Sequence, residues 1–169
     1  RTTIHHLNDK VVVGSNGKSY SFVNDSLDGV YILDAHSGNI DYHIQSQLLG
    51  DRDVNGVGVT SQALFFGDDN SQFFAYNWDY QERWRVTLNG DVEAAPVVVD
   101  FNLDGVMDVA VGTESGQLVA LDGKDGGFLW RFKAPIKARW TYPESNAFIA
   151  SPAAIDTNLD QIKDIFIGN

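Results

Sequence analysis

The sequence contains no cysteine and little positive charge, and each of these absences excludes a class of site. Without cysteine there can be no disulfide bond, thiolate metal site or cysteine nucleophile in its 169 residues. The net charge of −11 argues against a nucleic-acid partner, whose phosphates attract basic surfaces, and it suits cation binding. No apolar run approaches the roughly 18 residues that indicate a membrane-spanning helix. We therefore expect one globular domain without a membrane span.

Common catalytic motifs are absent as well. The four histidines lack the spacing of a zinc site. The sequence has neither a Gly-x-Ser-x-Gly elbow nor a glycine-rich phosphate loop. No segment shows a convincing helical period. These absences predict a protein that is not an enzyme and is built without helices.

Short apolar strands that end in glycine and a polar residue recur along the chain. They are KVVVGS (10–15), ALFFGD (63–68), VAVGT (109–113) and IFIGN (165–169). Two further strands follow each of the first three. They are expected at 30–34 and 40–44 after the first glycine strand, at 72–77 and 83–86 after the second, and at 117–122 and 129–132 after the third. Another strand precedes each glycine strand, at 2–5, 57–59, 96–99 and 152–155. The unit is therefore four short strands joined by turns, about 45 to 55 residues long, which is typical of a propeller blade.

This repeat predicts an all-β fold: a β-propeller of four-stranded antiparallel blades, forming a single domain over 1–169. A β-sandwich is the competing interpretation, but it predicts no fixed period. The blades are expected at about 1–49, 50–90 and 91–135, with an incomplete blade at 146–169. Because known propellers close with about four to eight blades, about three and a half blades would leave open edges. We expect the rest of a longer chain, or else other chains, to complete the ring, and we favour the longer chain.

The third repeat contains ALDGKDGGFLWRF (120–132), in which an Asp, a glycine turn and a Trp follow one another. This segment resembles the tryptophan-docking motif of quinoprotein-like (PQQ-like) propellers. The first repeat matches more loosely, with Tyr42 in place of the Trp, and the second keeps Trp84 but has NWDYQ (77–81) where the glycine turn belongs. In physical terms, the Asp can cap the turn, the Gly can take positive φ and the aromatic ring can pack between blades. The resemblance also raises one enzymatic alternative, part of a PQQ-dependent dehydrogenase.

Acidic residues alternate ahead of two of the glycine strands, in VDFNLDGVMDVAVGT (99–113) and IDTNLDQIKDIFIGN (155–169). Both segments resemble the calcium loops of FG-GAP and VCBS-type propeller repeats. Side-chain oxygens at positions 1, 3, 5 and 9, with a backbone carbonyl at position 7, can converge on one Ca²⁺. The predicted ligands are Asp100, Asn102, Asp104, Val106 and Asp108 in the first loop, and Asp156, Asn158, Asp160, Ile162 and Asp164 in the second.

The two loops differ from an EF-hand and from each other. An EF-hand needs a Glu at position 12, where these segments have Val111 and Ile167 inside apolar strands. Position 6 usually needs positive φ, which Gly105 takes freely and Gln161 takes at a cost on the order of 1 kcal/mol. We therefore expect the second loop to bind Ca²⁺ more weakly, or to hold its turn without metal. The alternative for each loop is a solvated acidic turn.

Other acidic segments have simpler interpretations. DRDVNG (51–56) aligns with NGDVEA (89–94) and is predicted to be a linker between blades rather than a cation site. Asp68, Asp69 and Asn70 are predicted to form a solvated hairpin turn.

Together these patterns predict a calcium-binding, non-enzymatic propeller module that serves as an interaction scaffold. We expect an extracellular or periplasmic location, because calcium there can fill sites with Kd on the order of 10⁻⁴ to 10⁻³ M. A protein or carbohydrate ligand of unknown identity is expected to dock on loops at one face. The longest inserts are 19–28 and 136–146, and the second carries the basic and aromatic stretch KARWTY (137–142).

Overall fold

The computed structural model describes residues 3–15, 26–45, 52–135 and 146–168, and every strand in these ranges pairs in an antiparallel manner. Of the two long inserts predicted at 19–28 and 136–146, residues 19–25 and 136–145 lie outside the described residues, and the second of these ranges includes KARWTY. No α-helix occurs in the described ranges, so none of their segments is a helix that could cross a membrane. The all-β prediction is confirmed.

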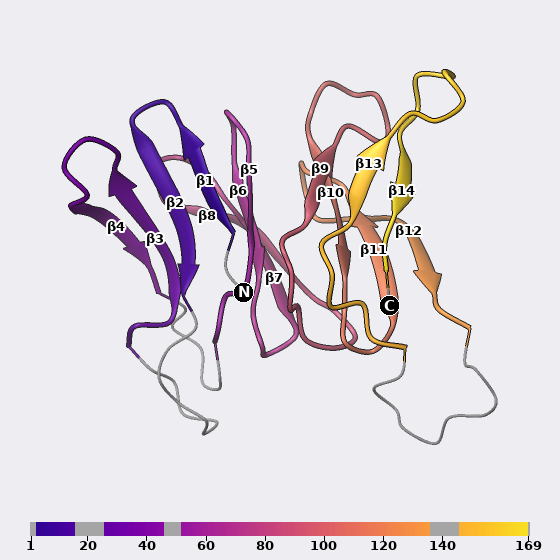
Figure 1. The fold of residues 1–169 in the computed structure, drawn as a ribbon, viewed down its shortest axis with the longest axis horizontal. Coiled ribbons are helices and arrows are strands. Elements are labelled where there is room, and N and C mark those ends of the chain that lie inside the picture. Colours follow the sequence, from indigo (N-terminus) through magenta and orange to yellow (C-terminus); the bar gives the residue numbers. More distant parts are fainter. Residues whose placement is uncertain (1–2, 16–25, 46–51, 136–145, 169) are drawn as a thin grey trace.

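Three four-stranded sheets and one two-stranded sheet follow one another along the chain (Figure 1). Blade 1 contains β1 (Ile4–Leu7), β2 (Lys10–Ser15), β3 (Gly29–Asp34) and β4 (Ile40–Ile44). Blade 2 contains β5 (Val57–Val59), β6 (Leu64–Gly67), β7 (Gln72–Tyr76) and β8 (Glu82–Thr87). Blade 3 contains β9 (Val97–Val99), β10 (Asp108–Gly112), β11 (Gln117–Leu121) and β12 (Phe128–Lys133), and the half-blade contains β13 (Ala153–Ile155) and β14 (Asp164–Phe166). The chain is therefore a partial propeller, as the repeat predicts.

The first strand lies two residues later than the sequence pattern indicates. The predicted strand at 2–5 is observed at Ile4–Leu7, where His6 pairs with Val11. The turn after it consists of Asn8 and Asp9 alone, with Asn8 at φ 55°. A side chain that bonds locally lets Asn adopt this left-handed conformation, and the pairing therefore continues further than the apolar pattern suggests.

Buried apolar side chains fill the spaces between successive blades. Between blades 1 and 2 these include Val12, Ile32, Leu64 and Phe74. Between blades 2 and 3 they include Phe65, Trp84, Val111 and Leu121. Between blade 3 and the half-blade they include Leu118, Ala120, Ala134 and Phe148, with the partly buried Ile165 packed against them. Blades 2 and 3 thus bury both faces, which explains their nearly continuous apolar strands.

In the three complete blades, the glycine near the end of the second strand allows the inter-blade linker to cross over that strand. A Cβ on any of these glycines would lie within 2.6 Å of a linker residue. The pairs are Gly14 with Val54, Gly67 with Val92, and Gly112 with Phe148. The backbone N–H of each linker residue also donates to the carbonyl of the residue after the glycine, at 3.1, 3.4 and 3.0 Å respectively. The recurring glycine therefore serves close backbone approach.

The turn and aromatic elements of the docking motif take their predicted roles. In blade 1, Asp34 accepts from the N–H of Ser37 at 2.7 Å, and Gly38 has φ 70°. In blade 3, Gly126 has φ 77°, and a Cβ there would lie 2.8 Å from the Trp84 ring of blade 2. The Asp and Gly therefore shape the turn on which the neighbouring aromatic ring rests.

Candidate metal-binding loops

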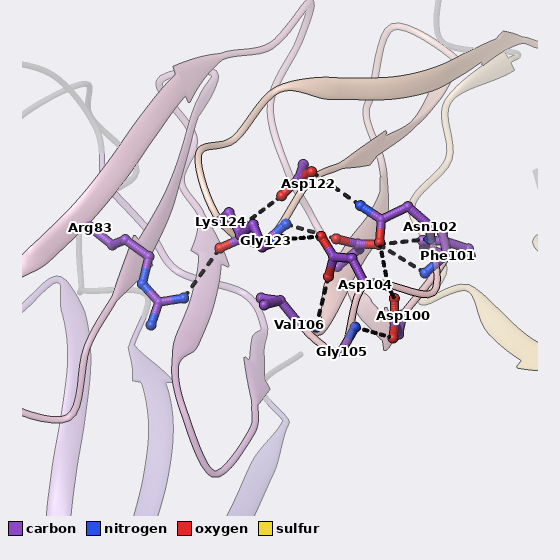
Figure 2. A network of polar contacts seen from close by, with 11 residues as sticks. Arg83, Asp100, Phe101, Asn102, Asp104, Gly105, Val106, Asp122, Gly123 and Lys124 are labelled. Atoms are coloured by element: carbon purple, nitrogen blue, oxygen red, sulfur yellow. Dashed lines mark hydrogen bonds and ion pairs between the residues drawn. The ribbon is translucent and has the colours of Figure 1, made fainter.

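The first predicted calcium loop joins β9 to β10 and is held by its own side chains (Figure 2). Asp100 accepts from the N–H of Gly105 at 2.9 Å, Asn102 from that of Asp104 at 3.1 Å, and Asp104 from that of Val106 at 2.8 Å. Three of the predicted ligand side chains therefore bond to N–H groups within the loop. A carboxylate has roughly four lone-pair positions, so accepting one N–H leaves it able to bind a cation.

Two residues of this loop have the left-handed backbone conformation. Gly105, at position 6, has φ 84°, as predicted. Leu103, at position 4, has φ 58° and is 67% exposed, which the sequence does not indicate. A non-glycine residue in this region costs about 1–2 kcal/mol, so the loop's hydrogen bonds offset backbone strain.

Asp108, the predicted ligand at position 9, is fully buried. One carboxylate oxygen accepts from the N–H of Phe101 at 2.8 Å and of Asn102 at 3.3 Å, and the other accepts from Gly123 at 2.9 Å. Burial raises the pKa of the Asp108 carboxyl, while these N–H donors oppose the rise. Asp108 therefore ties its loop to the turn between β11 and β12.

A cation from the protein already lies on the loop. Lys124 Nζ forms an ion pair with Asp104 Oδ2, and this hydrogen bond lowers the pKa of the Asp104 carboxyl. Within the described ranges, no three His, Asp or Glu side chains are grouped closely enough to hold a metal ion. The loop offers only oxygen donors, which suit Ca²⁺, and Lys124 would compete with a metal ion for Asp104.

The second loop joins β13 to β14 and repeats the hydrogen bonds of the first. Asp156 accepts from the N–H of Gln161 at 2.9 Å, Asn158 from Asp160 at 3.1 Å, and Asp160 from Ile162 at 2.8 Å. Asp164 accepts from the N–H of Thr157 at 3.0 Å, which is the counterpart of the Asp108–Phe101 contact.

The backbone of the second loop also repeats that of the first, without glycine. Gln161 has φ 73° and Leu159 has φ 63°, matching Gly105 and Leu103. Asp164 is only partly buried, and the hydrogen bonds from Thr157 lower the pKa of its carboxyl. The two loops therefore share one conformation but differ in the burial of the last carboxylate.

The first loop is connected to the neighbouring blade through Gly123. The carbonyl of Gly123 accepts from Arg83 Nη1 at 3.2 Å (Figure 2). The same carbonyl accepts from Trp84 Nε1 at 3.0 Å, and the N–H of Gly123 donates to Asp108. Asn102 Nδ2 also donates to Asp122 in the same turn at 3.2 Å. The sequence places Gly123 in the docking motif, but the spacing of the acidic residues gives no sign of this connection.

The structure also corrects one predicted solvated turn. Asp68 is buried, 1% exposed, and forms an ion pair at 3.3 Å with Arg52, which is equally buried. Burial raises the pKa of Asp68, opposed by the N–H groups of Gln72 and Asn70 and by Arg52. The linker DRDVNG therefore supplies Arg52 as the counter-ion of the buried Asp68 carboxylate. The one sign of this role in the sequence is that Asp68 directly follows the repeat glycine Gly67.

A family model described as outer membrane protein assembly factor BamB matches residues 30–153. BamB of Yersinia pestis is 31% identical over 101 residues, which cover 59% of this chain and 24% of that protein. The chain therefore matches about a quarter of the length of this curated relative.

Solved structures agree on the fold. The structure of BamB from Moraxella catarrhalis matches 79% of this chain and 35% of its own, with a TM-score of 0.59 at 18% identity. The structure of a quinohemoprotein alcohol dehydrogenase from Pseudomonas putida HK5 matches 77% of this chain and 20% of its own, with a TM-score of 0.56 at 20% identity. The PQQ-like resemblance is thereby confirmed, whereas the FG-GAP resemblance of the two loops stays a prediction. The chain belongs to the family of PQQ-like propeller repeats whose model is described as outer membrane protein assembly factor BamB.

Proposed function

We propose that the chain is part of a non-enzymatic propeller scaffold for protein assembly at an outer membrane. The observation that carries this proposal is the family match over 30–153, which includes blades 2 and 3 and the last two strands of blade 1. A scaffold of this kind would lie on the periplasmic side, where its partners would be proteins.

A chimera tests this role. The 101 aligned residues of the Yersinia pestis relative are replaced by the corresponding residues of this chain, and the amount of folded outer-membrane protein is measured. We expect assembly to continue at close to the level of the unmodified relative. A chimera that is present at normal amounts but does not support assembly would overturn the proposal.

The dehydrogenase is the second candidate, and the solved quinohemoprotein shares only the fold with this chain. Dye-linked oxidation of alcohols and sugars, measured after PQQ and Ca²⁺ are added, separates the two. We expect no turnover above that of free PQQ. Turnover that saturates with protein would establish the enzymatic alternative.

We further propose that the loop at 100–108 binds Ca²⁺. The support is its set of hard oxygen donors, together with a second loop that takes the same hydrogen-bonded conformation. Asp100, Asn102, Asp104 and Asp108 would hold the ion with the carbonyl of Val106. A bound Ca²⁺ would supply positive charge that offsets the repulsion between the carboxylates. Millimolar calcium outside the cytoplasm would suffice for such a site.

Thermal unfolding with Ca²⁺ and with a chelator tests this site, since a ligand that binds only the folded state raises Tm. Terbium luminescence is a second readout, because the Trp130 ring lies 5.7 Å from the ring of Phe101 in the loop and can act as sensitiser. We expect both signals to be lost in Asp100→Asn/Asp104→Asn. An unchanged Tm and no terbium signal in the original chain would overturn the calcium proposal.

We also propose that further blades cover the open ends of the arc. At one end Ile155 and Phe166 of the half-blade are 56% and 52% exposed, and at the other Ile4 is 72% exposed. Apolar sheet faces of this kind are buried between blades elsewhere in the chain. Light scattering of the 169-residue chain tests whether these blades belong to a longer chain or to a second copy. A monomer supports blades from a longer chain, whereas a stable dimer would overturn that proposal.

A further inference from the structure

The interface between blades 1 and 2 departs from the pattern of the next interface. Between blades 2 and 3, Trp84 is 8% exposed and packs directly on Gly126 of the facing turn. Between blades 1 and 2, Tyr42 takes the place of Trp84, and it is 40% exposed. Its ring stacks on Tyr80 with the centroids 4.1 Å apart and the planes within 8°. The smaller aromatic residue therefore rests on another ring instead of on a glycine.

Tyr80 adopts a conformation that its turn normally assigns to glycine. Its φ is 63°, and the corresponding residues Gly38 and Gly126 have φ 70° and 77°. An aromatic residue in this region costs about 1–3 kcal/mol, and such strain is concentrated at functional sites. The chain thus keeps an unfavourable tyrosine at a position where the neighbouring blades have a glycine.

A groove of about 480 Å³ lies beside this stacked pair, within the range of small-molecule pockets. Both blades that form it are complete four-stranded sheets. It is lined by Tyr42, Phe74, Tyr76, Tyr80, Glu82 and Arg85. Four aromatic rings therefore surround a space that also contains an acid and a base.

The charges in the groove compensate each other. Arg85 Nε donates to Glu82 Oε1 at 2.8 Å, and the same guanidinium lies 6.0 Å from the Phe74 ring. The amide of Gln81 adds hydrogen-bonding groups to the lining of the groove. An ionic ligand would have to compete with the Arg85–Glu82 pair, whereas a neutral ligand would not.

We propose that this groove binds a neutral saccharide, with one apolar face of a sugar ring against Tyr42 or Tyr80 and its hydroxyl groups toward Gln81, Glu82 and Arg85. Aromatic faces accept the C–H face of a sugar, and paired donors and acceptors satisfy hydroxyls, each of which both donates and accepts. The site is separate from the acidic loops and from the assembly role, so its test is independent of both.

Cellobiose and maltose serve as probes, at millimolar concentrations in the presence of a chelator, with saturation-transfer NMR and calorimetry as readouts. We expect at least one disaccharide to bind, and Tyr42→Ala and Tyr80→Gly each to weaken its binding by roughly tenfold or more. Tyr80→Gly is the decisive variant, since glycine accepts this φ and the protein should remain folded. The matched control is Phe128→Ala, which removes a 41% exposed ring from β12, away from the groove.

Three results would overturn the proposal. The first is no binding of either disaccharide at any concentration tested. The second is binding that persists unchanged in a folded Tyr80→Gly variant. The third is binding of N-acetylphenylalaninamide, a probe for a protein side chain, at this groove more tightly than either disaccharide.

Discussion

Asp108 and Trp84, which belong to neighbouring blades, both bond to the same residue, Gly123. The Asp108 carboxylate accepts the N–H of Gly123 at 2.9 Å, and the Trp84 indole donates to its carbonyl at 3.0 Å. The predicted calcium loop is therefore connected to the aromatic ring that packs blade 2 against blade 3. Any change that moves the loop should be felt at this interface.

Asp108→Asn should destabilise the chain by about 1–3 kcal/mol, because an amide cannot accept all three N–H groups around the buried carboxylate. Combined with Trp84→Phe, it should show a coupling of about 0.5–3 kcal/mol in a double-mutant cycle measured by denaturant unfolding. The control is Asp125→Asn, which changes an exposed turn residue that caps Gly127. Additive effects of the two substitutions would contradict the connection through Gly123.

The left-handed residues at position 6 should respond in opposite ways. Gly105→Ala should lower the free energy of unfolding by about 1–2 kcal/mol, since an added Cβ meets nothing within 4 Å and only the backbone is strained. Gln161→Gly should raise it by up to about 1 kcal/mol, because strain is removed. Gly168→Ala, with open space and no positive φ, is the control and should be neutral. Equal effects at 105 and 168 would refute the conformational explanation.

Lys124→Gln should increase the affinity of the first loop for Ca²⁺ several-fold, because the ammonium group competes for Asp104. A calcium titration that displaces bound terbium, read by the loss of terbium luminescence, measures this change in affinity. Lys133→Gln removes an exposed charge from β12 and should alter the affinity little. If both variants behave alike, the Lys124–Asp104 pair does not compete with the metal.

Glu93 should make stability depend on pH. Burial, followed by Glu114 and Asp91, raises the pKa of its carboxyl above the ordinary 4.5. The folded state therefore binds the proton more tightly than the unfolded chain, and this contribution to stability is full below pH 4.5 and is lost as pH rises through the folded pKa. Glu93→Gln resembles the protonated form, so it should stabilise the protein at neutral pH and have little effect at acid pH. The free energy of unfolding of both proteins is measured across this pH range. If the two values do not become equal at acid pH, Glu93 is not the group responsible.

Most of the fold could be predicted from the chain's own repetition. The glycine strands, the Asp-Gly turns and the docking aromatics each recur at blade spacing, and each depends on local backbone chemistry. The end of the first strand could not be predicted, because pairing of His6 with Val11 decides it and no apolar pattern marks that pair.

For the acidic loops, the sequence predicts the turn conformation well but not the contacts that the loops make with the rest of the blade. Alternating Asp and Asn side chains bond to N–H groups a few residues away, so their spacing alone indicates the turn. The burial of Asp108, its bond to Gly123 and the ion pair of Lys124 with Asp104 all involve residues about 15 to 20 positions apart, and so they depend on how β11 and β12 pack beside the loop.

The sequence by itself therefore determined the blade repeat, the turns and the two acidic loops, because these features depend on neighbouring residues and on a period that can be counted. Only the tertiary structure decided that Asp68 is buried against Arg52, that Gly123 joins Asp108 to Trp84, and that a groove opens where Tyr42 meets Tyr80. These are contacts between side chains that are distant in sequence, and their burial and charge are set by the packing of one blade on the next.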